Sequence, residues 1–143
     1  MTPEFQGLED RLDELNTRLT RLQELAQHER EEFDTTRDLR DIAERNFEVA
    51  AQCCIDIAHR IISLEEARKP QDYYESFLRL GELDVISDDL ARTLAPLAGF
   101  RNALVHEYAK VDWDEVYGNF DRLSDLEDFK RAVGQYMRER GGE

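Results

Sequence analysis

The strongest constraint on the fold of this chain is the spacing of its apolar residues, which return every three or four positions along most of the sequence. The first such stripe falls within residues 1–33 and consists of Leu8, Leu12, Leu15, Leu19, Leu22, Ala26 and Phe33. Steps of three and four place side chains on one face of an α-helix, whereas strands need a period of two, and no useful length of that alternation occurs. We therefore expect an all-α fold, an antiparallel bundle of about five helices that begins with a long amphipathic helix over residues 1–33.

The next helices are separated by residues that begin or end helices. Residues 35–66 carry the longest apolar stripe, and its small members predict close packing at the centre of the bundle: Ala50, Ala51, Cys53, Cys54 and Ala58. A short helix over residues 73–80 should follow, with Gly81 as its left-handed stop. Pro96 and Gly99 then predict a bend in the next helix.

The last part of the chain predicts one more helix and no second domain. Asp112 is placed to cap a helix that carries apolar residues as far as Val133, and residues 141–143 should form a frayed tail. No repeat or low-complexity linker divides the sequence, and 143 residues fit one domain with a real core. We expect a single helical domain over residues 1–143.

The charge balance restricts the partners of the chain. The formal net charge is −14 and the pI is near 4.6. Such a protein as a whole repels nucleic acid and anionic membranes, so an anionic substrate would need a local positive site. Arg79, Arg92 and Lys110 are the cations that could join Arg101 in such a site.

Compartment and cysteine usage give further expectations. No charged and then apolar leader opens the sequence, and its apolar runs are only a few residues long, so we expect a cytoplasmic protein without membrane contact. Cys53 and Cys54 are adjacent in helical pattern, where neighbouring thiols point in different directions, so they should be reduced packing residues. No metal-ligand spacing accompanies them, and we expect neither a metal nor a cofactor.

Residues 100–108 are the one place where an arginine, an asparagine, a histidine and a tyrosine lie close together. On a helix, Arg101 and Tyr108 would lie almost on one line, while His106 would lie about 140° round from Arg101 and one turn from Asn102. A single site would have to gather these groups from a broad arc, with help from a bend, a helix end or a second protomer. The simpler alternative is a buried Arg101 paired with a carboxylate, and a His106 that caps or fills a helix face.

Polar residues also interrupt the apolar stripe of the longest helix, at Gln52, Asp56, His59 and Arg60. Asp56 and Arg60 are four positions apart and would form an ion pair on the helix surface. Alternatively, Asp56 or His59 lines a pocket that is shared with residues 100–108. The spacing leaves both interpretations open.

Arginine, histidine and tyrosine without a metal cluster suit work on phosphate. A guanidinium offers a planar fork for two phosphate oxygens, and an imidazole can transfer a proton near neutral pH. These groups could break an RNA phosphodiester through its own 2′-hydroxyl. His106 would move a proton, Arg101 would stabilise charge on the phosphoryl oxygens, and Asn102 would orient the imidazole or the phosphate. The spacing of Arg101 and His106 alone is too common to establish this activity.

Four segments are more specific in combination than the spacing of Arg101 and His106 alone: 50–58, 74–77, Arg101-Asn102-x-x-x-His106-x-Tyr108 and Val111-Asp112. This combination resembles the HepT family of the HEPN superfamily, and the likeness extends over nearly the whole chain. The members of this family are ribonuclease toxins that are encoded beside an MNT-type minimal nucleotidyltransferase antitoxin.

The resemblance implies a HEPN-type bundle that forms a homodimer, with two motifs facing one composite cleft, and metal-independent cleavage of RNA. Arg101 and His106 match the catalytic pair of the family, and Asn102 matches the polar position after the arginine. Tyr108 matches the tyrosine that the partner nucleotidyltransferase modifies with AMP from ATP; that AMP would add negative charge and bulk where a substrate phosphate binds. The alternative function is a non-catalytic helical module that docks a minimal nucleotidyltransferase or a nucleotide.

Overall fold

The computed structural model describes residues 5–106 and 111–141. Within these residues it contains no strand, and its elements are α1 (Gln6–Leu25), α2 (Arg30–Thr35), α3 (Arg37–Leu64), α4 (Tyr73–Glu82), α5 (Asp88–Leu94), α6 (Leu97–His106), α7 (Trp113–Gly118), the 3₁₀ turn η2 (Asn119–Arg122) and α8 (Leu123–Arg140). The prediction of an all-α bundle is confirmed. About five helices were expected, and the described residues form eight, of which α1, α3, α4, α6 and α8 have ten or more residues. None of the described helices is long and apolar enough to cross a lipid bilayer.

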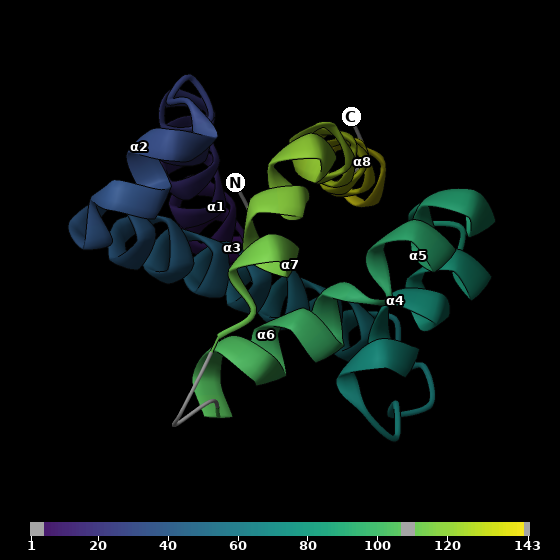
Figure 1. The fold of residues 1–143 in the computed structure, drawn as a ribbon. Coiled ribbons are helices and arrows are strands. Elements are labelled where there is room, and N and C mark those ends of the chain that lie inside the picture. Colours follow the sequence, from purple (N-terminus) through teal and green to yellow (C-terminus); the bar gives the residue numbers. More distant parts are fainter. Residues whose placement is uncertain (1–4, 107–110, 142–143) are drawn as a thin grey trace.

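Helix α3 lies at the centre of the bundle and contacts α1, α2, α4 and α6 (Figure 1). Its small residues are almost completely buried, as predicted, and let these neighbours approach closely: Ala43, Ala50, Ala51, Cys54 and Ala58. Cys53 and Cys54 are both free and buried, and burial raises the pKa of Cys53 to about 11. The apolar stripe of α1 is buried mainly against α3 and α8, so it serves the fold of its own chain.

The predicted long N-terminal helix is present as α1, but its predicted extent over residues 1–33 is wrong, because α1 ends at Leu25 and a separate helix, α2, begins at Arg30. Glu29 starts the new helix with a capping box. Its side chain accepts from the backbone of Glu32, while its own backbone N–H donates to Oε1 of Glu32 over 3.0 Å. The apolar stripe skips position 29 at this break.

Helices α2 and α7 are held together by aromatic packing. Phe33 of α2 is fully buried, and its ring lies 5.3 Å from that of Trp113 and 5.6 Å from that of Phe120. Phe120 in turn contacts Phe47 of α3, with their ring centroids 5.1 Å apart. Pairs of this geometry stabilise a core beyond the area they bury. The cluster therefore fixes the start of α7 against the body of the bundle.

The C-terminal region differs from the expected single last helix. Asp112 acts as a cap, as predicted, because its Oδ1 accepts from the backbone of Asp114 at 3.0 Å, but the helix it begins is the short α7. The turn η2 separates α7 from α8. Gly141 closes α8 instead of fraying, since its N–H donates to the carbonyl of Met137 at 2.9 Å. Residues 142 and 143 lie outside the described residues.

The prediction that Gly81 ends its helix in a left-handed conformation is wrong, because Gly81 lies inside α4. A Cβ at this position would come within 3.0 Å of Ala91 Cβ and of Asp88 Oδ1, so the glycine is needed where α5 crosses α4. The left-handed residue comes later, at Asp84, which has φ 60°. Tertiary packing, not helix termination, accounts for this glycine.

The predicted bend before Phe100 is confirmed as a break between α5 and α6. Helix α5 ends at Leu94, and α6 begins at Leu97 just after Pro96. Gly99 lies within α6 and is not part of the break. The break directs α6 across α3 and α4, and α6 carries the motif that the sequence singles out (Figure 1).

Candidate active site

Helix α6 carries three of the four candidate residues. Arg101 is half-buried, Asn102 is exposed, and His106 is exposed as the last residue of the helix. Tyr108, the predicted modification site, lies outside the described residues. The geometry of the candidate site is therefore set by α6 and the helices it packs against.

Arg101 is held by three contacts. Its Nε donates to Oε1 of Gln52 on α3 at 2.7 Å, and its Nη1 donates to Oδ1 of Asn102 at 3.1 Å. Its Cζ lies 5.5 Å from the centre of the Tyr73 ring on α4, a cation–π contact. An arginine fixed at two nitrogens and one face has little freedom to rotate.

Two further contacts extend from Gln52 to α1. The Nε2 of Gln52 donates to Oδ1 of Asp56 at 2.8 Å, and Oδ2 of Asp56 accepts from Nε of Arg11 at 3.2 Å. We call the residues Arg101, Gln52, Asp56 and Arg11 the relay. Asp56 and Arg101 also line one hollow, of about 390 Å³. The interpretation that Asp56 lines a pocket shared with the motif is thus confirmed.

Both hydrogen-bond partners of Arg101 are neutral amide oxygens. Within residues 5–106 and 111–141, no carboxylate forms an ion pair with Arg101, and its side chain is half-buried, not fully buried as in the alternative interpretation. Arg79 shows the contrast, because it is buried and forms ion pairs with Glu75 and Glu82. Arg79 is enclosed by carboxylates, whereas the described residues place none in an ion pair with Arg101.

The other cations near Arg101 are not those expected from the sequence. Arg79 is enclosed in its own ion pairs, Arg92 pairs with Asp89, and Lys110 lies outside the described residues. Instead, Arg11 and Arg45 line the hollow together with Arg101. Carboxylates of Glu14, Glu48 and Asp56 line it as well, so the three positive charges of the hollow are matched by three negative ones.

The described residues do not bring Arg101 and His106 together. The two side chains are five positions apart on one helix, which turns them about 140° from each other. The break at Pro96 precedes both residues, so it cannot bring them closer. No hydrogen bond, ion pair or ring contact joins His106 to Arg101 in the part of the chain that the structure describes.

His59 contacts Tyr73, the same ring that Arg101 contacts. Its Nε2 is 2.8 Å from Oγ of Ser76, and its ring centre is 5.4 Å from that of Tyr73. Burial lowers the pKa of His59, nearby Lys69 lowers it further, and Asp56 acts in the opposite direction. The lowered pKa favours the neutral form of His59, and its ring packs against Tyr73.

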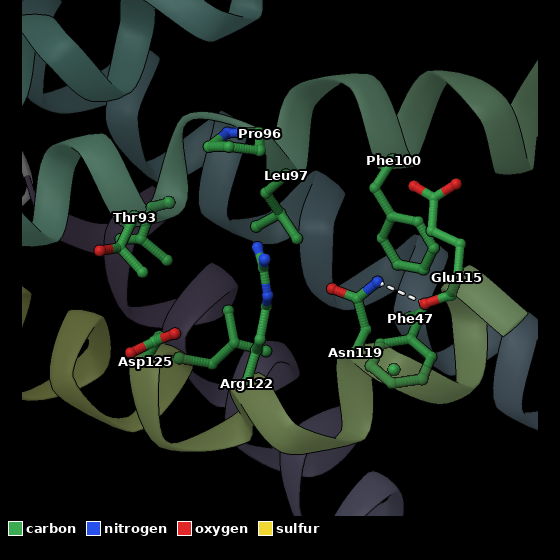
Figure 2. A pocket seen from close by; sticks show the side chains of 12 residues that line it. Phe47, Thr93, Pro96, Leu97, Phe100, Glu115, Asn119, Arg122 and Asp125 are labelled. Carbon is green, nitrogen blue, oxygen red and sulfur yellow. Dashed lines mark hydrogen bonds between the residues drawn. The ribbon is translucent and has the colours of Figure 1, made fainter.

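A second hollow, of about 350 Å³, lies on a different side of α6 (Figure 2). Its floor is apolar, with Phe47 and Phe100 on one side, and the side chain of Arg122 points toward Leu97 and Pro96. Neither Arg101 nor His106 lines it. This hollow is separate from the candidate site.

The sequence did not identify Tyr73 or Arg11 as parts of this site. Tyr73 follows the cap Asp72 as the first residue of α4, and Arg11 is one of many charged residues on α1. Neither has a fixed spacing from the motif, because the tertiary packing of α1 and α4 on α3 brings them there. No local signal distinguishes them from other surface residues.

Comparison with known proteins identifies the family. A family model described as Ribonuclease HepT-like matches residues 15–133. The chain is also 30% identical over 110 residues to the tRNA nuclease HepT of Aphanizomenon flos-aquae, which covers 77% of this chain and 75% of that protein. The chain belongs to the HepT-like ribonuclease family. Another relative, the mRNA nuclease HepT of Shewanella oneidensis, is 30% identical over 95 residues, or 66% of this chain and 70% of that one.

Solved structures share the fold of this HepT-like chain. The HEPN toxin of Shewanella oneidensis, solved in tri-AMPylated form in complex with an MNT antitoxin, matches with a TM-score of 0.81 and 24% identity over 94% of this chain and 99% of that one. A cytosolic protein of unknown function from Bacillus subtilis matches with a TM-score of 0.78 and 18% identity over 94% of each chain. The HEPN-type bundle predicted from the sequence is confirmed.

The position of His59 predicts a pH dependence of stability. Its folded pKa lies below the ordinary value of 6.5, so the folded state binds fewer protons than the unfolded state between those two values. The contribution of His59 to stability is therefore lost as pH falls from about 6.5 toward the folded pKa. Thermal unfolding of the wild type and of His59→Gln, measured at about pH 7.5 and about pH 5, should show a smaller acid-induced drop in Tm for the variant. Equal drops in both proteins would contradict this assignment.

Proposed function

We propose that this chain is the toxin component of a two-gene toxin–antitoxin system, a metal-independent RNA endonuclease that acts in the cytoplasm as a single domain over residues 1–143. The observation that supports the proposal most is the state of Arg101. Its guanidinium is fixed by amide oxygens and an aromatic face, and no described carboxylate neutralises it. Such a group is suited to bind a phosphate that carries the developing charge of a transition state.

The proposed reaction uses the 2′-hydroxyl of the RNA as the nucleophile. His106 takes the proton of that hydroxyl while its oxygen bonds to phosphorus, and the bond from phosphorus to the 5′-oxygen breaks. A cyclic 2′,3′-phosphate remains on one product, and the leaving 5′-oxygen receives a proton from an imidazolium or from water. Arg101 stabilises the charge on the non-bridging oxygens throughout. Asn102 holds Nη1 of Arg101 and presents its own amide N–H groups to the substrate.

A homodimer with a composite cleft is part of the proposal. Arg101 and His106 point about 140° apart on α6, and the relay holds Arg101 toward α3. A second copy of the chain can present its His106 to Arg101 of the first. Under this arrangement one cleft contains groups from both subunits.

An MNT-type nucleotidyltransferase is the proposed antitoxin. The HEPN toxin of Shewanella oneidensis has been solved in tri-AMPylated form with such a partner, and a toxin–antitoxin complex with AMP-PNP shares this fold with a TM-score of 0.82 and 24% identity over 90% of this chain and 98% of that one. We propose Tyr108 as the acceptor of AMP. The added phosphate would carry negative charge near Arg101 and compete with RNA for it.

Cleavage of RNA by the purified protein tests the activity. Wild type should cut tRNA or mRNA in the presence of EDTA, because the proposed chemistry uses only side chains. Arg101→Ala should lose roughly 10²- to 10³-fold in rate and His106→Ala roughly 10²- to 10⁴-fold. Arg21→Met, which changes an exposed arginine of α1 that pairs with Glu24, is the matched control. Cutting that survives both active-site substitutions would reject the proposal and favour the non-catalytic docking module.

Mixed dimers test the composite cleft. Neither the Arg101→Ala nor the His106→Ala homodimer should cleave RNA, but a dimer with one subunit of each kind contains one intact pair if Arg101 and His106 come from different subunits. Tandem purification of the mixed dimer, with two affinity tags, followed by the cleavage assay should recover up to about half of the wild-type rate. A mixed dimer as inactive as its parents would show that each subunit uses its own pair.

Mass spectrometry tests the modification. After co-expression with a minimal nucleotidyltransferase from the same locus, a peptide that contains Tyr108 should gain AMP, and the modified protein should lose cleavage activity through charge competition at Arg101. Tyr108→Phe should keep its activity under co-expression. If the Tyr108 peptide stays unmodified while activity is still suppressed, the antitoxin acts in another way.

A further inference from the structure

We propose that Gln52 is a positioning residue for Arg101, and that Asp56 and Arg11 fix Gln52 in the orientation this requires. The proposal rests on the proposed function, since it assigns a role in the same reaction. It concerns groups on α3 and α1, which do not belong to the motif on α6. The relay joins these three helices by hydrogen bonds of 2.7, 2.8 and 3.2 Å.

The chemistry of the relay allows only one orientation of the Gln52 amide. Arginine has donors only, so the group that faces Arg101 must be the amide oxygen. An ionised carboxylate has acceptors only, so the group that faces Asp56 must be the amide N–H₂. Gln52 therefore cannot flip without losing both bonds, and its oxygen is held toward Arg101.

Asp56 is in turn held in place by Arg11. Its two carboxylate oxygens are used separately, Oδ1 by Gln52 and Oδ2 by Arg11. The negative charge of Asp56 is thus engaged by a cation of α1 and does not approach Arg101 as an ion-pair partner. The relay separates one carboxylate from the guanidinium by one neutral amide.

This arrangement selects the edge of Arg101 that a phosphate can reach. Gln52 occupies Nε, so a phosphate cannot bind side-on through Nε and Nη2. Tyr73 covers one face, and Asn102 uses one direction at Nη1. The remaining fork of Nη1 and Nη2 is the edge left for two phosphate oxygens. A substitution of Gln52 that preserves packing would free Nε and let the guanidinium rotate about its stem.

Gln52→Met tests the positioning role, because methionine is unbranched and similar in length but makes no hydrogen bond to Arg101. We expect kcat to fall roughly 10- to 100-fold with KM little changed, since the positive charge stays but its orientation is lost. Asp56→Asn is the second variant, and it should reduce kcat less because an amide can still accept from Gln52. Arg21→Met should match wild type, because Arg21 lies outside the relay.

A readout that does not depend on activity separates positioning from a merely structural role. In ¹⁵N-labelled protein, the Nε–H signal of Arg101, assigned through its loss in Arg101→Lys, should exchange with water much faster in Gln52→Met, while Tm stays close to wild type. A wild-type kcat, or an unchanged Nε–H signal, in Gln52→Met would overturn the positioning role. A wild type that shows no Arg101-dependent cleavage would instead reject the proposed function, and the Nε–H measurement would still decide whether Gln52 holds Arg101.

Discussion

Four helices pack on α3, and the small volume of the side chains that α3 presents to them sets how closely they approach. Ala50, Ala51 and Ala58 have almost no exposed surface, so the neighbouring backbones come near enough for polar side chains of α3 to reach other helices directly. Gln52 and Asp56 are those polar side chains, and they meet α6 and α1 through hydrogen bonds of ordinary length. Larger residues in place of the alanines would separate the helices and break these contacts, including the one that holds Arg101.

Because the hydrogen-bond partners of Arg101 are neutral, its positive charge is not cancelled as it would be by a carboxylate. Amide oxygens satisfy its donors, which a half-buried guanidinium requires, but they do not cancel its charge. A carboxylate in the same place would bind more strongly, and a substrate phosphate would then have to displace it. In a chain with a net charge of −14, a phosphate meets repulsion from most of the surface. An arginine whose charge remains available is therefore the kind of local site that such a protein needs for an anionic substrate.

Long-range regularity made much of the fold predictable, whereas tertiary contacts decided the parts that were not. The apolar stripes of α1, α3 and α8 persist over many turns, so the all-α bundle could be predicted from spacing. The break at Glu29 depends on a local capping box, and the need for a glycine at position 81 depends on the close approach of α5. The spacing of apolar residues indicates neither feature. Helix boundaries were accordingly the weakest part of the prediction.

The candidate site divides in the same way. Arg101, Asn102 and His106 are neighbours in sequence, so their place on one helix and the arc between them could be predicted. The pocket that Asp56 shares with Arg101 could be raised only as an alternative, because a residue 45 positions from Arg11 finds its partner through packing of α1 on α3. The contact of Tyr73 with Arg101 could not be predicted from the sequence, since it depends on where α4 lies.

The fixed position of Arg101 also bears on how the proposed cleft can form. If Arg101 were free, it could rotate on its long side chain toward His106 and reduce the arc that α6 imposes. The contacts with Gln52 and Tyr73 hold it toward α3 and α4 instead, while His106 stays exposed at the end of α6. A single subunit thus orders its arginine in a way that keeps it away from its own histidine. Under the proposed reaction, this fixed orientation of Arg101 is an advantage only if the histidine comes from a second copy of the chain. Arg101 is then already in position when the cleft closes around the substrate, and ordering its side chain costs no further conformational entropy.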